Sequence, residues 1–184
     1  MATSSRPRVL LDASALISVI KDEPVAARVD GLLAMLDRGE AELVESVLIF
    51  GEVFKPSDSK DPGQRQAQNA TLAAIRSRLE SREVMLLDVT APVVRKATEY
   101  RLSHGLKLPD AVHLATAVLN RCDWLVTLDR DFPQMPGVLK VFRLEDLADA
   151  CIKLPWDVAV QDSLFDGESR PDNVIEFPHR EQGT

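Results

Sequence analysis

Residues 107–132, KLPDAVHLATAVLNRCDWLVTLDRDF, constrain the fold of this chain more than any other stretch, because they combine a buried helix with a buried strand. Pro109 is suited to the first turn of a helix, where its missing N–H costs nothing. Nearly every side chain in residues 111–119 is apolar or small, which predicts a helix that is buried on most sides. The apolar run 124–127 favours β-structure and ends at a turn-like break, so it predicts a short interior strand.

Strand and helix signals alternate along the rest of the sequence. Apolar runs predict strands at residues 8–12, 41–46, 84–89, 124–127 and 137–142. Helical spacing and helix-start signals predict helices at residues 13–20, 25–38, 47–54, 61–83, 91–103, 109–119 and 145–150. Alternation of this kind is typical of an α/β domain with a mostly parallel central sheet that is flanked by helices on both faces.

The length of 184 residues corresponds to one ordinary domain with some room to spare. We place the domain at residues 6–150, followed by an acidic extension that contains prolines at residues 151–184. The extension has no clear helical period, yet its apolar content is too high for a purely disordered tail. We therefore expect it to be partly ordered at most, with a part that packs on the domain, extends a sheet edge or mediates association.

Composition and charge narrow the classes of protein. The chain is 45% hydrophobic and 28% charged, has no run of 18 apolar residues, and begins with no secretory signal, so a soluble cytoplasmic protein without membrane association is expected. Cys122 and Cys151 are isolated, which supports neither a disulfide framework nor a zinc site. The net charge of −7 argues against nucleic-acid binding, but residues 151–184 hold seven acids and three bases, which leaves only −3 on the domain.

Acidic side chains occur at the ends of elements that should meet at one edge of the sheet. Asp12 ends the first strand, and Asp129 and Asp131 follow the fourth. Asp110 lies in the first turn of its helix, and Glu52 is the only charge in an otherwise apolar segment. An isolated acid there is costly unless it is paired, bound to a metal or pointed at water. Because reactive groups of open α/β sheets lie beyond the carboxyl ends of the strands, these acids are candidates for one site.

Each acid also has a purely structural explanation. Asp12 or Ser14 can cap the following helix, and Asp110 can simply favour a helix start. Glu52 can face solvent, and the two acids after the fourth strand can be ordinary turn residues. A strand that ends in Asp also fits a haloacid-dehalogenase-type phosphatase, but that class requires a second Asp at the position of Ser14.

Four segments, in this order and spacing, resemble the acidic motifs of the PIN-domain ribonucleases, particularly of VapC-type toxins from bacterial toxin–antitoxin pairs: VLLDASALISVI, SVLIFGEVF, LPDAVHLATAV and LVTLDRDF. The match spans about residues 8–142 and implies the PIN-like three-layer fold. It implies that the catalytic acids are Asp12, Glu52, Asp110 and Asp129. It also implies supporting hydroxyl groups from Ser14 and Thr127.

The resemblance implies a metal-dependent endoribonuclease that hydrolyses single-stranded RNA, forms a homodimer and is neutralised by a cognate antitoxin. Converging carboxylates repel one another, and Mg²⁺ or Mn²⁺ relieves this repulsion because hard cations prefer carboxylate oxygens. The expected metal ligands are Asp12, Asp110, Asp129 and Asp131, with the direct ligand left open between the last two. Two alternatives stay open: a PIN nuclease of RNA processing without a toxin role, and a catalytically silent PIN-fold binding module.

Basic residues near the start of the Asp110 helix are candidates for binding RNA phosphates. They are Arg95, Lys96, Arg101 and Lys107, joined by Arg130 in the last motif. The arginines of residues 61–83 are expected to form a solvated face rather than a substrate groove. His113, one turn beyond Asp110, is expected to be a buried histidine with satisfied hydrogen bonds rather than a residue of the site.

Overall fold

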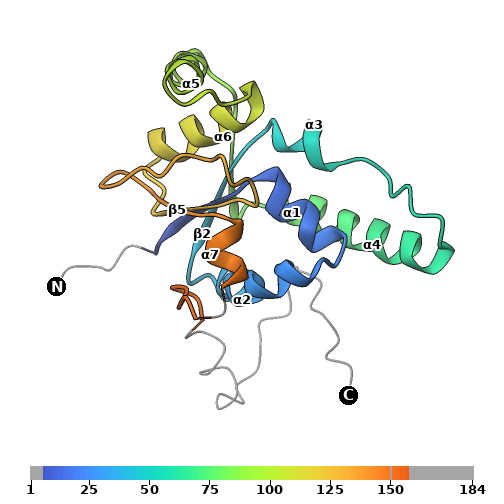
Figure 1. The fold of residues 1–184 in the computed structure, drawn as a ribbon. Helices are drawn as coiled ribbons and strands as arrows, with labels where there is room; N and C mark the ends of the chain where they lie inside the picture. Colours follow the sequence, from blue (N-terminus) through green and yellow to red (C-terminus); the bar gives the residue numbers. More distant parts are fainter. Residues whose placement is uncertain (1–5, 150, 158–184) are drawn as a thin grey trace.

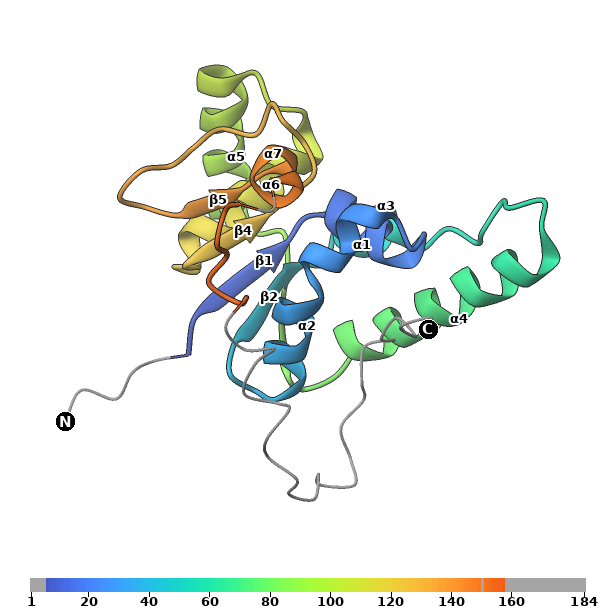
Figure 2. The same ribbon diagram turned by 60° about the horizontal axis from the view of Figure 1, so that its bottom comes forward.

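The centre of the molecule is a five-stranded sheet in which every neighbouring pair of strands is parallel (Figure 1). The structure is a computed structural model that describes residues 6–149 and 151–157. The strands are β1 (Arg8–Leu11), β2 (Glu42–Ser46), β3 (Val84–Leu87), β4 (Trp124–Val126) and β5 (Lys140–Phe142). Their spatial order is β3-β2-β1-β4-β5, so β1 lies in the middle, between β2 and β4 (Figure 2). The predicted α/β class with a mostly parallel sheet is confirmed.

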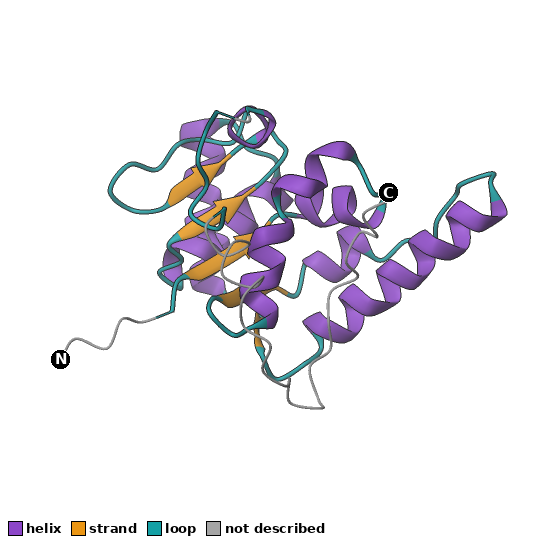
Figure 3. Cartoon of the chain, turned by 90° about the horizontal axis from the view of Figure 1, so that it is seen from below, coloured by secondary structure: helices purple, strands orange, loops and turns teal. Residues whose placement is uncertain are grey.

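Alternate side chains of the strands point to opposite faces of the sheet and build two cores. On β1, Val9 and Leu11 join the first core, whereas Leu10 joins the second. The first core is covered by α1 (Ala13–Ile20), α2 (Asp30–Asp37), α3 (Ile49–Val53), α4 (Pro62–Leu79) and α7 (Leu144–Ala148), and the second by α5 (Ala91–His104) and α6 (Leu108–Leu119). Figure 3 shows the strands between these helices, which confirms the predicted three-layer arrangement.

The longest helix, α4, has 18 residues, and no helix in the described part of the chain is long and apolar enough to cross a membrane.

Arg78 on α4 was predicted to lie on a solvated face, and this prediction was wrong. Its side chain is buried, donates to the Leu36 carbonyl at 2.8 Å and pairs with Glu83. A long guanidinium side chain can reach the carbonyl groups at the end of α2, and it ties the two helices together.

The helix predicted over residues 25–38 is two elements, a 3-10 helix η1 (Pro24–Arg28) and α2. At the break between them, the Arg28 carbonyl accepts a hydrogen bond from the Trp156 indole Nε1 at 2.7 Å. Gly31 lies against the same tryptophan, since a Cβ built there would be 2.7 Å from the Trp156 carbonyl oxygen. The prediction of a single helix was wrong because a segment distant in sequence packs at this point.

Residues 151–157 pack on the first core. Trp156 is completely buried, and its ring centroid lies 4.9 Å from that of Phe142 and 5.6 Å from that of Trp124. Leu154 is buried beside it. The remainder of the predicted extension, residues 158–184, and residue 150 at the end of a predicted helix lie outside the described residues. The domain boundary at residue 150 stays a prediction.

Candidate active site

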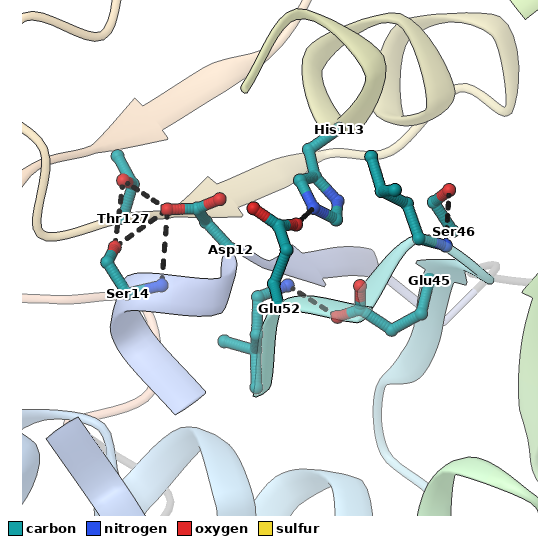
Figure 4. Close-up of polar contacts among 9 residues, drawn as sticks. Asp12, Ser14, Glu45, Ser46, Glu52, His113 and Thr127 are labelled. Atoms are coloured by element: carbon teal, nitrogen blue, oxygen red, sulfur yellow. Dashed lines mark hydrogen bonds and ion pairs between the residues drawn. The ribbon is translucent and has the colours of Figure 1, made fainter. Parts of the chain in front are cut away.

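Asp12 lies at the carboxyl end of the central strand and is held by both neighbouring chain segments. Its Oδ2 accepts hydrogen bonds from the Ser14 N–H at 3.4 Å, the Ser14 hydroxyl at 2.7 Å and the Thr127 hydroxyl at 2.9 Å. Its own N–H donates to the Val126 carbonyl of β4 at 2.9 Å. All three side-chain bonds go to one oxygen, and Figure 4 shows the other oxygen pointing toward Glu52. Asp12 therefore both caps α1 and presents one oxygen to the other acids.

Asp110 is a half-buried acid in the first turn of α6. Burial raises its pKa, and the charges of Asp12, Asp129 and Glu52 raise it further, to about 6. Lys107, at the start of the same helix, lowers it in part. The charges of the other three predicted catalytic acids therefore all act on Asp110.

Glu52, on α3, is bound by a histidine from the opposite side of the sheet. Its Oε2 lies 2.6 Å from Nε2 of His113, which projects from α6 and is completely buried. The second ring nitrogen, Nδ1, is buried and has no hydrogen-bond partner among the described residues. His113 is buried as predicted, but the expectation that it is satisfied and separate from the site was wrong, because its partner is one of the acids.

Asp129 and Asp131 take different positions in the turn after β4. The Asp129 N–H donates to the Thr127 hydroxyl at 3.0 Å, and its carboxylate accepts the Asp131 N–H at 2.8 Å. Asp129 is one of the charges that raise the pKa of Asp110, whereas Asp131 is exposed and is not one of them. The fold thus places Asp129 with the other acids and Asp131 on the outer side of the turn.

Glu45 on β2 was not singled out from the sequence, although it is fully buried. Its Oε1 accepts a hydrogen bond from the Leu11 N–H at 2.9 Å, directly before Asp12 (Figure 4). Burial raises its pKa well above the usual range, and the charges of Asp12 and Glu52 act in the same direction. The available signal was its place on the strand, two residues after the buried Leu43 and hence on the same face.

The five basic candidates differ in their surroundings. Lys107 acts directly on Asp110, since its charge lowers the pKa of that carboxyl. Lys96 instead forms an ion pair with Glu99 at 2.7 Å on the surface of α5. The other three are exposed: Arg95 and Arg101 on α5, and Arg130 in the turn after β4. Lys107 therefore acts on an acid of the site, and Arg130 is the sequence neighbour of Asp129 and Asp131.

The donor set fits a hard divalent cation in its chemistry. The acids present carboxylate oxygens, which Mg²⁺ and Mn²⁺ prefer, and the charges of Asp12, Asp129 and Glu52 add to burial in raising the pKa of Asp110. The side chains stand apart as repelling acids, and within residues 6–149 and 151–157 no three Asp, Glu, His or Cys side chains are already gathered as a metal site. Cation binding would therefore draw these side chains together.

Comparison with known proteins identifies the family. A model of the PIN domain matches residues 9–138. The chain belongs to the PIN domain family. This family consists of nucleases, and the PIN domain here contains all four motif acids. No curated protein matches the sequence.

Solved structures similar to this PIN domain come from toxin–antitoxin systems. VapBC2 from Rickettsia felis, bound to a DNA fragment from its promoter, is 17% identical, with a TM-score of 0.53 over 74% of this chain and 98% of that chain. A toxin–antitoxin complex from Klebsiella pneumoniae is 24% identical, with 0.47 over 73% and 95%. VapC20 from Mycobacterium tuberculosis, a sarcin–ricin loop cleaving toxin, is 19% identical, with 0.46 over 64% and 86%. The first of these supports the fold.

Proposed function

We propose that this PIN domain is a divalent-metal-dependent endoribonuclease that hydrolyses phosphodiester bonds of single-stranded RNA, and that it is the toxin of a toxin–antitoxin pair. The observation that carries the proposal is the environment of Asp110, a half-buried acid whose pKa is raised by burial and raised further by the charges of Asp12, Asp129 and Glu52. Such crowding of like charges destabilises the metal-free protein. A catalytically silent binding module would have no use for it.

Asp12, Asp110 and Asp129 are the proposed inner metal-binding residues, with Asp131 as an outer one. When bound, Mg²⁺ or Mn²⁺ supplies charge compensation and Lewis-acid activation for phosphodiester hydrolysis. Ser14 and Thr127 orient Asp12 by binding its Oδ2.

Glu52 is proposed to orient the attacking water and accept its proton. Its Oε2 is held by His113, which leaves Oε1 for this role. The reaction is direct hydrolysis without a covalent enzyme intermediate.

Basic side chains at the junction of α5 and α6 support a polyanionic substrate. The charge of Lys107 lowers the pKa of Asp110, and the exposed Arg101 lies in the last turn of α5. Phosphate groups on either side of the scissile bond can be bound by such cations. Arg95, Lys96 and Arg130 are proposed to bind phosphates farther from the cleavage point.

The toxin role, the cognate antitoxin and the homodimer are supported by the four-motif resemblance to VapC-type toxins. Exposed apolar side chains on α5 and α6, namely Val94, Leu102 and Leu108, offer contact area for a second copy. Light scattering of the purified protein tests the homodimer. Inhibition of cleavage by the product of a small adjacent gene distinguishes a toxin from a nuclease of RNA processing.

The decisive experiment measures cleavage of an internally labelled single-stranded RNA of mixed sequence, with matched DNA and duplex RNA as competing substrates. Wild-type protein is compared with Asp110→Asn in Mg²⁺, Mn²⁺ and EDTA. Asp58→Asn is the matched control, because it removes one negative charge at an exposed residue of the loop between α3 and α4. We expect metal-dependent internal cleavage of the single-stranded RNA by wild type and by the control, and none by Asp110→Asn.

Two results would contradict the proposal. Cleavage by Asp110→Asn at the wild-type rate would remove the acids from the chemistry. A folded wild-type protein that cuts neither mixed RNA nor total cellular RNA under any metal would favour the binding module instead.

A further inference from the structure

The carboxyl group of Glu45 lies next to the end of β1, directly before Asp12, and only one of its two oxygens has a hydrogen-bond partner among the described residues. Its Oε1 accepts the Leu11 N–H at 2.9 Å. Its Oε2 is buried and has no hydrogen-bond partner among the described residues. A buried acid in this condition is costly, so its presence on the central part of the sheet requires an explanation.

The bond to Leu11 replaces a missing rung of the sheet. β1 and β2 pair at Arg8 with Glu42 and at Val9 with Leu43, and the pairing ends there. On its other edge β1 stays paired with β4 as far as Leu11. The Glu45 side chain therefore binds the Leu11 amide that the backbone of β2 no longer reaches, and it holds the end of β1 from the β2 side.

We infer that Glu45 is a positioning residue of the acidic site: its carboxyl group fixes the end of β1 through the Leu11 amide and thereby sets the place of Asp12. Asp12 directly follows Leu11, and its own N–H is bound by β4 at 2.9 Å. The end of β1 is thus held by the Glu45 side chain on the β2 side and by the β4 backbone on the other side. This inference rests on the proposed function, because the consequence of a displaced Asp12 is lost catalysis.

The surroundings of the Glu45 carboxyl act on its pKa in two directions. Burial raises the pKa well above its usual range and the charges of Asp12 and Glu52 raise it further, whereas the hydrogen bond from the Leu11 N–H lowers it in part. One oxygen of the carboxyl group accepts the Leu11 N–H, and Figure 4 shows the other oxygen on the side where Glu52 and His113 lie. A neutral amide of the same shape reproduces both features, so glutamine is the conservative replacement.

The test compares Glu45→Gln, Glu45→Leu and Leu36→Ala in the full chain. Leu36→Ala is the control for lost stability, since Leu36 is buried on α2 in the first core. Three quantities are measured: kcat and KM on single-stranded RNA, Mn²⁺ affinity by calorimetry, and hydrogen exchange of the Leu11 amide relative to that of Val9.

Glu45→Leu is expected to lower kcat by about tenfold to 100-fold with little change in KM, as a small displacement of a catalytic group does. Its Mn²⁺ affinity should fall by about tenfold, and the Leu11 amide should exchange faster than the Val9 amide. Glu45→Gln should restore all three values toward wild type. Leu36→Ala should lower the melting temperature while retaining kcat and Mn²⁺ affinity.

The inference is overturned if Glu45→Leu keeps kcat and Mn²⁺ affinity, if Glu45→Gln loses as much as Glu45→Leu, or if Leu36→Ala loses as much as either. Failure of the proposed function is distinguishable, because it appears as a wild-type protein that does not cut RNA. In that case Mn²⁺ affinity and Leu11 exchange still decide the role of Glu45, and a wild type that binds no Mn²⁺ overturns both proposals.

Discussion

The substitution Asp110→Asn should stabilise the metal-free protein at neutral pH. It removes the charge that lies among Asp12, Glu52 and Asp129 and keeps the shape of the side chain. A rise in pKa from 3.8 to about 6 corresponds to about 3 kcal/mol for a fully shielded group. Asp110 is only half-buried, and its place in the first turn of α6 favours a negative charge. The expected net gain is therefore about 1 kcal/mol, or roughly 2–4 °C in melting temperature.

The pH dependence of this gain has a definite sign. Because the folded-state pKa of Asp110 is raised, protonated Asp110 favours the fold, and this contribution is lost as pH rises from about 4 through about 6. Wild type and Asp110→Asn should therefore be equally stable below about pH 4 and should diverge up to about pH 7. Saturating Mg²⁺ should reverse the order, since the cation stabilises the protein that binds it more tightly.

Urea unfolding at several pH values, in EDTA and then in Mg²⁺, measures these differences. Asp58→Asn is again the matched control and should change stability little at any pH. A loss of stability in Asp110→Asn at neutral pH in EDTA, or a gain that does not vary with pH, would refute the account of crowded carboxylates.

Two further predictions concern the core. Trp156→Ala should lower the free energy of unfolding by about 3–5 kcal/mol, because it removes a fully buried ring that contacts Phe142 and Trp124; a loss below about 1 kcal/mol in urea unfolding would show that residues 151–157 are dispensable. In the native protein at pH 8, a thiol reagent should modify the exposed Cys151 rapidly. Burial raises the pKa of the Cys122 thiol to about 12, so Cys122 should react only on unfolding, and rapid reaction of both thiols would contradict its burial.

The fold class and the places of the motif acids on their strands and helices could be predicted because both depend on local patterns. Short apolar runs alternate with helices, and parallel strands place their carboxyl ends at one edge of the sheet. Asp12 at the end of β1 and Asp110 at the start of α6 follow directly from these rules. Predicted element ends differ where turns intervene: β5 begins at Lys140, after a turn in which Gly137 has φ +76°.

The contacts that organise the site could not be predicted, because each depends on register or on segments distant in sequence. Glu45 reaches Leu11 only because the pairing of β1 with β2 ends at Val9. The near-continuous apolar runs of buried parallel strands do not show where such pairing ends. His113 meets Glu52 across 61 positions. The place of Glu45 on the same face of β2 as the buried Leu43 is the sequence signal for the contact between Glu45 and Leu11. The sequence contains no comparable signal for the contact between His113 and Glu52.

The hydrogen bond between Asp12 and Thr127 joins residues that are 115 positions apart, and it spans the middle of the sheet from β1 to β4. Contacts of such long range carry a large loop-closure cost and form slowly in parallel sheets. The hydrogen bond between Asp12 and Thr127 therefore forms only once β4 has paired with β1. A fragment that ends before β4 lacks both this hydrogen bond and Asp129, so we expect it to have no hydrolytic activity.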